Sequence, residues 1–269
     1  MQAAASHAFG LDVGLIPVQG GERAPGAVVP SWGQAAPARN VELELTVYDR
    51  PDVTPRERSE ILSRALNVAV AAIAIVLLFP VILLVALAVK LTSRGPVLYS
   101  QIRVGLDQRY RRKGTDERRR QDLGGRPFRM YKFRSMCVNA ESDGKAVWAQ
   151  KQDPRVTPIG NLLRRTRLDE LPQLWNVLRG DMNVVGPRPE RPVIFAELRE
   201  NIPEYPLRQR VKPGITGWAQ INQSYDSCLD DVRNKVEKDL EYMRRQSFGH
   251  DIRIMTMTLP VMLFRRGGW

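Results

Sequence analysis

The most pronounced hydrophobic pattern in the chain is an apolar run from Ala65 to Val89, 25 residues without a charge. As one straight helix it would be about 38 Å long, enough to cross the hydrocarbon core of a bilayer. Pro80 lies inside the run and favours a break in the helix. Positive charges on both sides of the run predict that both of its ends lie on the cytoplasmic face; they belong to Arg56, Arg58, Arg64, Lys90, Arg94 and Arg103. The pattern therefore favours a broken, re-entrant helix over residues 56–94, with a kinked single span as the alternative.

Alternation with a period of two predicts a strand from Phe128 to Met136. One side of this strand carries Phe128, Met130, Lys132, Arg134 and Met136, and the other carries Arg129, Tyr131, Phe133 and Ser135. Cations on a strand are either solvated or directed at an acidic partner elsewhere in the fold. Lys132 and Arg134 are the two that could reach such a partner.

A helical pattern surrounds Pro172, a residue that fits only the first turn of a helix. The pattern predicts a helix that begins near Asp169 and ends at Gly180, with an apolar face made of Leu171, Leu174, Trp175 and Leu178. Asp169 and Glu170 then lie at the helix start, where Asp is a preferred cap and Glu complements the helix dipole. Capping explains both acids without any chemistry, and it is the simpler interpretation of this segment alone.

Other helical patterns begin at Pro192 and at Leu229, and the second continues to about Arg245 as scaffold. The segment from Ile252 to Phe264 is mostly apolar, too short to span a bilayer, and followed by two arginines. This pattern favours an interfacial helix, with a buried core helix as the alternative.

The N-terminal residues 1–55 contain six Pro and six Gly with little periodicity, which predicts a mostly disordered tail. Within this tail only residues 41–47 alternate well enough to form a short strand. The remaining length allows one good-sized domain with a core of its own.

A net charge of +12 points to one of two partner classes, nucleic acid or an anionic membrane with phosphorylated substrates. An insertion at residues 107–125 contributes +3 of this charge, since seven basic and four acidic residues lie between Asp107 and Asp122. The insertion either rests on anionic lipid headgroups or is a solvated loop, and both interpretations stay open. Only Tyr110 interleaves its charges, so we expect no nucleic-acid partner.

The two cysteines, Cys137 and Cys228, have no metal-ligand spacing and form no disulfide framework. This usage fits a reducing cytosolic environment and argues against a zinc site.

Arginines surround the two acids in the sequence: Arg164, Arg165 and Arg167 precede them, and Arg188 follows within Gly186-Pro187-Arg188-Pro189. A carboxylate that attacks a phosphate meets like-charge repulsion. That repulsion is relieved by a hard cation on carboxylate oxygens and by guanidinium groups on the non-bridging oxygens. The neighbouring arginines therefore favour phosphate chemistry over a simple cap.

Three ordered motifs resemble the bacterial monotopic phosphoglycosyl transferases, sugar transferases that load a hexose 1-phosphate onto undecaprenyl phosphate. The motifs are YKFRSM at 131–136, LDELPQLWNVLRGDMNVVGPRPE at 168–190 and KPGITGWAQIN at 212–222. The resemblance covers about residues 56–269. It implies an α+β, helix-rich, monotopic membrane protein with a broken re-entrant membrane helix. One cytosolic catalytic domain over residues 95–269 would then lie on the cytoplasmic face of the bacterial inner membrane.

The resemblance also implies a reaction, in which a UDP-sugar gives its hexose 1-phosphate to undecaprenyl phosphate and UMP is released. Asp169 would be the nucleophile and would form a phosphosugar-aspartyl intermediate, Glu170 and Asp169 would hold Mg²⁺, and Lys132 would complete the catalytic set. The implied substrate-binding residues are Arg164, Arg188, Pro187, Pro189 and, less directly, Arg134. By analogy the sugar is glucose or galactose, for exopolysaccharide assembly.

Two other classes stay open: an inactive relative that scaffolds polysaccharide enzymes, and a membrane-tethered nucleic-acid-binding or regulatory protein. Release of UMP from a UDP-sugar discriminates between them and the enzyme. The sequence leaves open which sugar is used, whether the chain forms a homo-oligomer, and what the tail does.

Overall fold

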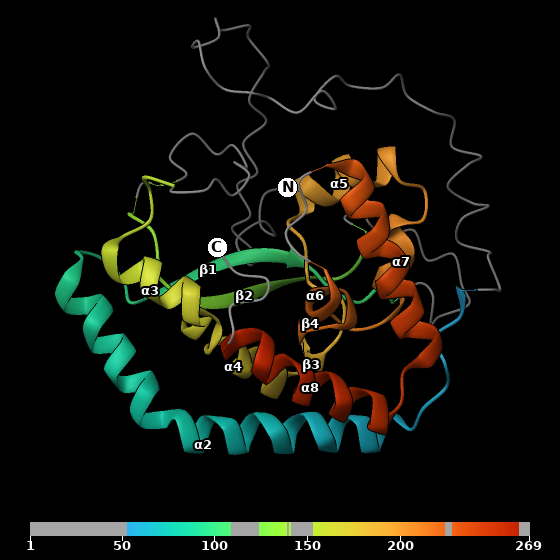
Figure 1. The fold of residues 1–269 in the computed structure, drawn as a ribbon, viewed down its shortest axis with the longest axis horizontal. Helices are drawn as coiled ribbons and strands as arrows, with labels where there is room; N and C mark the ends of the chain where they lie inside the picture. The colour runs from blue at the N-terminus through green and yellow to red at the C-terminus, as the bar shows by residue number, and fades with distance from the viewer. Residues whose placement is uncertain (1–52, 109–123, 139, 141–152, 224–227, 264–269) are drawn as a thin grey trace, which may run out of the picture. The chain divides into compact units, whose positions relative to one another are not determined.

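The computed structural model of the chain describes residues 53–108, 124–138, 140, 153–223 and 228–263. All of them belong to one unit, Ala36–Trp269. Over these ranges the chain is helix-rich with two small two-stranded sheets, in agreement with the α+β prediction (Figure 1). The elements in chain order are α2 (Glu60–Thr92), β1 (Leu98–Val104), β2 (Pro127–Phe133), α3 (Pro158–Thr166), the 3₁₀ turn η2 (Leu168–Glu170), α4 (Gln173–Arg179), β3 (Asn183–Val185), α5 (Pro192–Asn201), the 3₁₀ helix η3 (Tyr205–Arg210), β4 (Gly214–Thr216), α6 (Trp218–Asn222), α7 (Leu229–Arg245) and α8 (Phe248–Leu263).

The apolar run folds as α2, a continuous helix of 33 residues that contains Pro80. Ser59 caps its start by accepting a hydrogen bond from the Leu62 amide at 3.4 Å. Figure 1 shows that α2 bends along its course. A proline removes one backbone hydrogen bond and its ring displaces the preceding turn, which bends a helix without ending it. The predicted break is therefore a bend.

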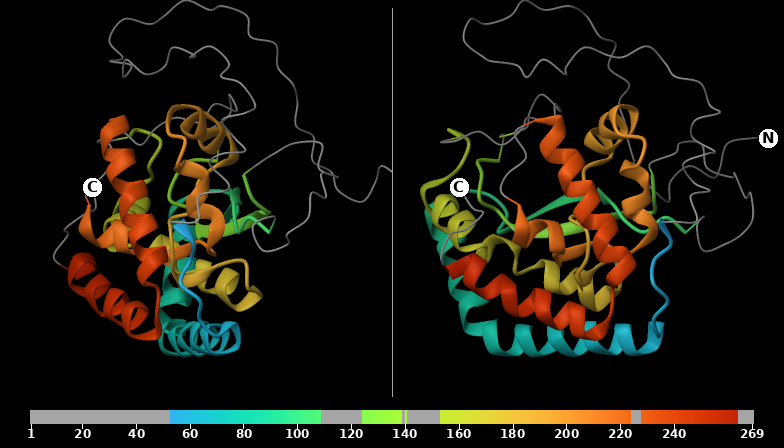
Figure 2. Two further views of the ribbon diagram at one scale, coloured as in Figure 1. Left: turned by 90° about the vertical axis from the view of Figure 1, so that its right-hand side faces the viewer. Right: turned by 45° about the vertical axis from the view of Figure 1, so that its right-hand side comes forward.

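Both halves of α2 pack against the rest of the domain, which lies on one side of the helix in each view of Figure 2. The first half joins a buried cluster with β2 and α4, made of Ala71, Phe128, Met130, Leu174, Val177 and Met182. The second half joins a cluster with β2 and α3, made of Val85, Val89, Phe133 and Leu163.

The opposite face of α2 is apolar and exposed. Its large side chains that stand free of the domain are Ile61, Leu62, Ile73, Val76, Leu77, Phe79, Leu83, Leu84, Leu87 and Leu91. Within the part of the chain that the structure describes, α2 alone is long and apolar enough to cross a membrane, and 11% of its most apolar stretch is buried. A continuous apolar surface of this kind is typical of contact with lipid.

The predicted strand is confirmed from Pro127 to Phe133 as β2, which pairs antiparallel with β1. It ends earlier than its pattern suggests, and a hydrogen bond of 2.9 Å from the Arg134 amide to the Val97 carbonyl continues the same register by one pair. The other end of the hairpin leads into the insertion, whose base is closed by hydrogen bonds between Gly105 and Arg126 and between Arg126 and Leu106. The basic residues of the insertion lie outside the described residues, so its contact with lipid stays a prediction.

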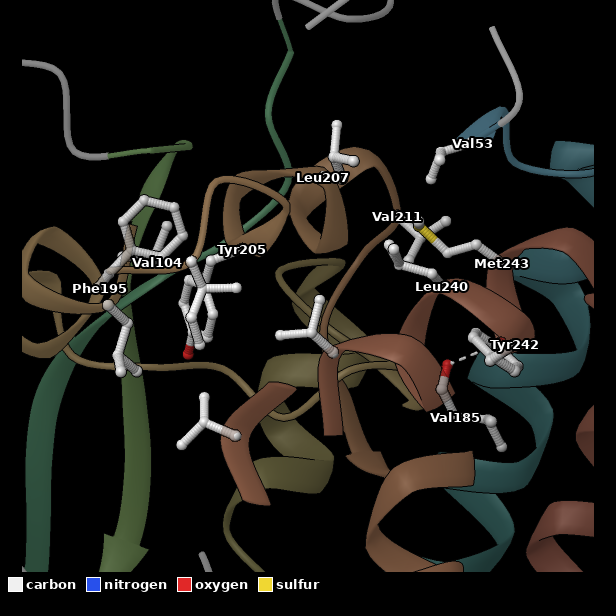
Figure 3. Packing of buried hydrophobic residues seen from close by; sticks show 14 of the residues in the cluster. Val53, Val104, Val185, Phe195, Tyr205, Leu207, Val211, Leu240, Tyr242 and Met243 are labelled. Carbon is white, nitrogen blue, oxygen red and sulfur yellow. Dashed lines mark hydrogen bonds between the residues drawn. The ribbon is translucent and has the colours of Figure 1, made fainter. Parts of the chain in front are cut away.

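The second sheet pairs β3 with β4 in parallel, with Val185 opposite Thr216. Above it lies the largest core, which unites α5, η3, α7 and α8 (Figure 3). A hydrogen bond of 3.3 Å from the Tyr242 hydroxyl to the Val185 carbonyl ties α7 to β3 inside this core. Val53 is also buried in it, so the domain begins before the predicted end of the tail at residue 55. The predicted strand at 41–47 lies outside the described residues.

The helices predicted from Pro192 and Leu229 are confirmed as α5 and α7. The C-terminal pattern forms α8, which begins at Phe248 and has both an inner and an outer apolar face. Ile254 is fully buried, whereas Ile252 and Leu259 are 49% and 62% exposed. One side of α8 is therefore core and the other side is exposed, and the predicted contact of that side with a membrane surface stays a prediction.

Candidate active site

The segment between α3 and α4 does not form the continuous helix that its pattern predicts. Asp169 and Glu170 lie in the 3₁₀ turn η2, which follows Arg167 in the left-handed conformation at φ 58°. α4 begins only at Gln173, because Pro172 has no N–H to donate one turn back. The positions that cap η2 and α4 are Arg167 and Pro172, and neither makes a side-chain cap bond. The interpretation of Asp169 as a helix cap is therefore wrong.

The later start of α4 also changes its buried face. Leu174 and Val177 are buried, whereas Trp175 is 56% exposed, so the prediction of Trp175 on the apolar face is wrong. The predicted end of the helix is correct, since Gly180 closes α4 in the left-handed region at φ 89°.

Both acids are buried: Asp169 is 6% and Glu170 7% exposed. The Oδ1 atom of Asp169 accepts no hydrogen bond from any described residue. Buried polar atoms are nearly always satisfied, because desolvation without a partner is costly. A buried carboxylate oxygen without a donor is therefore an indication of a ligand, such as a cation or a reacting group.

Glu170, in contrast, is surrounded by cations that the fold brings from three segments. Its Oε1 atom lies 2.9 Å from Arg188 Nη2, 3.2 Å from Lys132 Nζ and 3.7 Å from Arg167 Nη1. Lys132 comes from β2, Arg188 from the loop after β3, and Arg167 from the end of α3. The structure thus brings Lys132 and Arg188 together around one carboxylate oxygen of the pair Asp169 and Glu170, which we call the dyad. Their catalytic roles stay a prediction.

The two neighbouring carboxyls are shifted in opposite directions by these surroundings. Burial alone would raise the pKa of Glu170, but Arg188 and Lys132 hold that pKa well below its ordinary value. Burial raises the pKa of Asp169, and Lys132 only partly counteracts this effect. Burial lowers the pKa of Lys132, and the negative charge of Glu170 only partly offsets this effect. Paired acids with opposite pKa shifts are typical of active sites that assign them different roles.

The loop that carries Arg188 is held close to the segment from Lys212 to Gly214. A Cβ atom at Gly186 would lie 2.4 Å from the Lys212 carbonyl oxygen, so only glycine permits this approach. Pro187 and Pro189 are both buried beside Arg188. Their direct contact with substrate stays a prediction, but they fix the backbone that presents Arg188.

Two predicted substrate-binding residues make no contact with the dyad among the described hydrogen bonds and ion pairs. Arg134 is buried and donates from Nη2 to the carbonyl and hydroxyl oxygens of Ser93, at 2.8 Å and 2.6 Å. It therefore ties β2 to the C-terminal end of α2. Arg164 is half-buried on α3, and its role toward a phosphate stays a prediction.

Sequence analysis assigned no role to several residues of this site and its surroundings. Arg167 was visible as one of the arginines before the dyad, and its spacing of three from Glu170 was the signal of an ion pair. No such signal marked the contacts around the loop that carries Arg188, because the partners are remote in sequence. In these contacts Arg103 pairs with Glu190 and donates to the Pro189 carbonyl, and Arg208 donates to the Arg188 carbonyl.

The carboxylates of Asp169 and Glu170 fit a magnesium ion whose other ligands come from the substrate. Within the part of the chain that the structure describes, no three His, Cys, Asp or Glu residues are grouped as a metal site. Mg²⁺ is commonly bound by one or two carboxylates together with substrate phosphates. Asp169, with its unsatisfied oxygen, and Glu170 match that pattern.

Comparison with known proteins identifies the family of the chain. The family described as bacterial sugar transferase matches residues 58–265. The UDP-glucose:undecaprenyl-phosphate glucose-1-phosphate transferase of Escherichia coli (strain K12) is 44% identical over 203 residues, 75% of this chain and 40% of that protein. The UDP-N-acetylgalactosamine-undecaprenyl-phosphate N-acetylgalactosaminephosphotransferase of Aeromonas hydrophila is 42% identical over 202 residues, 75% of this chain and 44% of that protein.

A third relative, the UDP-glucose:undecaprenyl-phosphate glucose-1-phosphate transferase of Caulobacter vibrioides, is 38% identical over 212 residues, 78% of this chain and 72% of that protein. The chain spans about two fifths of the length of the first two relatives, 40% and 44%. The family match contains the dyad, Lys132 and Arg188. The chain therefore belongs to the bacterial sugar transferase family.

Proposed function

We propose that this protein transfers a hexose 1-phosphate from a UDP-sugar to undecaprenyl phosphate and releases UMP, through a covalent intermediate on Asp169. The observation that carries the proposal is the contrast within the dyad: a buried Asp169 oxygen without a donor beside a Glu170 oxygen with three cations. The names of the relatives, which act on UDP-glucose or UDP-N-acetylgalactosamine and undecaprenyl phosphate, support the substrate classes.

In the first step a carboxylate oxygen of Asp169 forms a bond to the β-phosphorus of the donor. The bond from that phosphorus to the bridging oxygen breaks, and UMP leaves with the electron pair. The product on the enzyme is a mixed carboxylic-phosphoric anhydride, which is reactive enough for a weak nucleophile. In the second step a phosphate oxygen of the lipid attacks the same phosphorus, and the Asp169 carboxylate is regenerated.

The cations around Glu170 serve this chemistry by position. Arg188 and Lys132 lie 2.9 Å and 3.2 Å from Glu170, so Glu170 fixes both side chains before substrate arrives. They can then share their remaining donors with the non-bridging oxygens, where negative charge accumulates in the transition state. Glu170 thus acts as an orienting residue, and its low pKa keeps it charged for that role.

Asp169 and Glu170 are the residues that would hold Mg²⁺ together with the donor phosphates. When bound, the ion supplies positive charge that offsets the repulsion between carboxylate and phosphate.

The membrane topology proposed here is re-entrant, with both ends of α2 on the cytoplasmic face. Near its first end, Arg64 donates to the Val177 and Leu178 carbonyl oxygens of α4. At the other end, Ser93 accepts from Arg134 of the β1–β2 region. A straight helix of 33 residues would reach about 50 Å, well beyond the roughly 30 Å hydrocarbon core. Attachment of both ends to one domain instead supports a helix that enters and leaves through one leaflet.

Thiol accessibility tests this topology. Glu57→Cys and Thr92→Cys lie at exposed positions at the two ends of α2, and each is made in a background without Cys137 and Cys228. Both cysteines should resist an impermeant thiol reagent in intact cells and react after lysis. Reaction at one end alone in intact cells would mean a spanning helix.

Donor labelled in the β-phosphate tests the mechanism. Without lipid acceptor, the wild-type protein should retain label on the peptide that contains Asp169 and release UMP. Asp169→Asn should lose both label and UMP release, since an amide forms no acyl phosphate. Glu170→Gln is the matched variant, and it should label slowly because its cations are displaced. Formation of lipid-linked product without any covalent label would mean direct attack by the lipid phosphate, and the intermediate would be rejected. The same assay across UDP-sugars identifies the donor.

A further inference from the structure

The loop that carries Arg188 has no helix or strand of its own, yet the rest of the domain fixes its backbone. Each carbonyl oxygen from Pro187 to Glu190 accepts a hydrogen bond from another segment. The donors are Gly214 N to Pro187 at 2.9 Å, Arg208 Nη2 to Arg188 at 3.2 Å, Arg103 Nη1 to Pro189 at 3.0 Å and Val104 N to Glu190 at 2.9 Å. Two of these donors are backbone amides of the sheets, and two are arginine side chains.

Arg208 is the more deeply buried of the two arginine donors. It lies on η3, is fully buried, and directs Nε and Nη2 at one Asp239 oxygen, at 2.9 Å and 2.6 Å. Its Nη1 donates to the Tyr205 hydroxyl at 2.7 Å. Tyr205 lies in the core beside Phe195, with ring centroids 5.4 Å apart (Figure 3). Burial opposes the charge of Arg208, but Tyr205 and Asp239 raise the pKa of its guanidinium above the ordinary value.

A buried ion pair is not needed for packing at this position. Apolar side chains of similar volume commonly replace such pairs without loss of stability. They could not, however, donate to the Arg188 carbonyl. Lysine would also fall short, because its three donors lie on one compact ammonium group, whereas the guanidinium makes two hydrogen bonds to Asp239, one to Tyr205 and one to the Arg188 carbonyl. The distinctive feature of this pair is therefore its third contact, with the loop.

We propose that Arg208 and Asp239 are positioning residues that fix the Arg188 backbone and thereby direct the Arg188 side chain to Glu170 and the donor phosphates. Asp239 orients the guanidinium, whose Nη2 atom holds the Arg188 carbonyl oxygen at 3.2 Å. The Arg188 side chain then reaches Glu170 at 2.9 Å. This inference rests on the proposed transfer reaction, in which Arg188 contacts the substrate.

Arg208→Lys tests the proposal, measured as kcat and KM for UMP release by the full chain. Misplacement of a contact made in the transition state should lower kcat by about tenfold or more. The same substitution is then made together with Arg188→Lys. If Arg208 acts through Arg188, the second substitution should add less than about twofold to the loss, because the contact it supports is already gone.

Asp251→Asn is the matched control, because Asp251 also forms a buried pair with an arginine, Arg58 at 2.6 Å, and accepts from a tyrosine hydroxyl, Tyr242 at 2.8 Å. It has no described hydrogen bond to the Arg188 loop. Asp251→Asn should lower the melting midpoint but leave kcat unchanged, and Asp239→Asn should lower both. Should Arg208→Lys not fold, Asp239→Asn takes its place in the double substitution.

Two results would overturn different statements. If the wild-type chain releases no UMP from any UDP-sugar, the proposed function fails. If the wild-type chain is active and the losses from Arg208 and Arg188 substitutions simply multiply, or if Asp251→Asn lowers kcat as much as Asp239→Asn, the pair is only structural. The positioning proposal is then wrong, while the transfer reaction stands.

Discussion

Removal of the Lys132 charge should shift the acidic limb of the pH profile of the reaction to higher pH. Lys132 Nζ lies 3.2 Å from Glu170 and is also the main group that counteracts the raised pKa of Asp169. Lys132→Gln leaves a shorter, neutral polar side chain in place of the cation. The pKa of Asp169 should then rise further, so that the reactive carboxylate forms only at higher pH.

The size of the effect follows from the separation. An opposite charge within about 4–6 Å stabilises an ionised carboxyl by about 1–4 kcal/mol. For the neighbouring Glu170–Lys132 pair at 3.2 Å, a bare Coulomb estimate with an effective dielectric constant of about 20 gives about 5 kcal/mol. Asp169 forms no ion pair with Lys132 among the described contacts, so this value is an upper bound for the effect on Asp169. Arg188 and Arg167 remain near the dyad and reduce the loss. We therefore expect kcat/KM at about pH 6 to fall at least tenfold more than at about pH 9.

The assay is kcat/KM for UMP release between about pH 5 and pH 9, because this ratio reports ionisations of the free enzyme. The sign is fixed: activity lost below the raised pKa of Asp169 should return as pH rises above it. Lys132→Arg keeps the charge and should leave the acidic limb of the profile in place. An equal loss at every pH in Lys132→Gln would refute the electrostatic role and leave Lys132 as a substrate contact alone.

Three further perturbations follow from the same contacts. Asp169→Asn should raise the melting midpoint at about pH 8 but not at about pH 4, because a buried acid with a raised pKa destabilises the fold only where it is ionised; equal midpoint changes at both pH values would contradict this. Gly160→Ala should lower the midpoint, since its Cβ would lie 1.9 Å from the Ser135 carbonyl oxygen, whereas Gly249→Ala, with nothing within 4 Å, should not; indistinguishable variants would disprove the close approach. Chelation of Mg²⁺ should stop UMP release reversibly without changing the midpoint, and unfolding on chelation would indicate a structural metal instead.

Local sequence patterns were sufficient where one segment determines its own structure. The alternation around Phe128 predicted β2, and the apolar run predicted α2. Pro172 was correctly placed at a helix start, but its missing N–H also forces the preceding residues into a 3₁₀ turn. Asp169 therefore does not occupy the cap position of α4. The capping rules had placed it there because they assume that a helix begins at its first acidic residues.

Contacts between remote segments could not be predicted in the same way. Arg208 and Asp239 are 31 residues apart, and nothing in either segment marks a pairing. Arg134 illustrates the opposite error, a predicted substrate-binding residue that makes no described contact with the dyad. It shares a motif with Lys132, but β2 ends between the two residues. Beyond that end, Arg134 Nη2 donates to Ser93 at the end of α2. A motif preserves residue order, whereas the direction of each side chain depends on where the strand stops.

The position of the dyad relative to α2 shows how the proposed reaction could use both a soluble donor and a lipid acceptor. Leu168 and Leu171, on either side of the two acids, pack against the cluster formed with the second half of α2. Phe133 packs into that cluster, while the preceding Lys132 reaches Glu170. Successive residues of β2 thus connect the membrane helix to the reactive carboxylates. An acceptor whose phosphate lies at the membrane surface would need to travel little to reach Asp169, and a nucleotide sugar could approach from the domain side. Such an arrangement suits the proposed two-step transfer, because a covalent intermediate on Asp169 would then lie close to the membrane surface, where a lipid phosphate would be found.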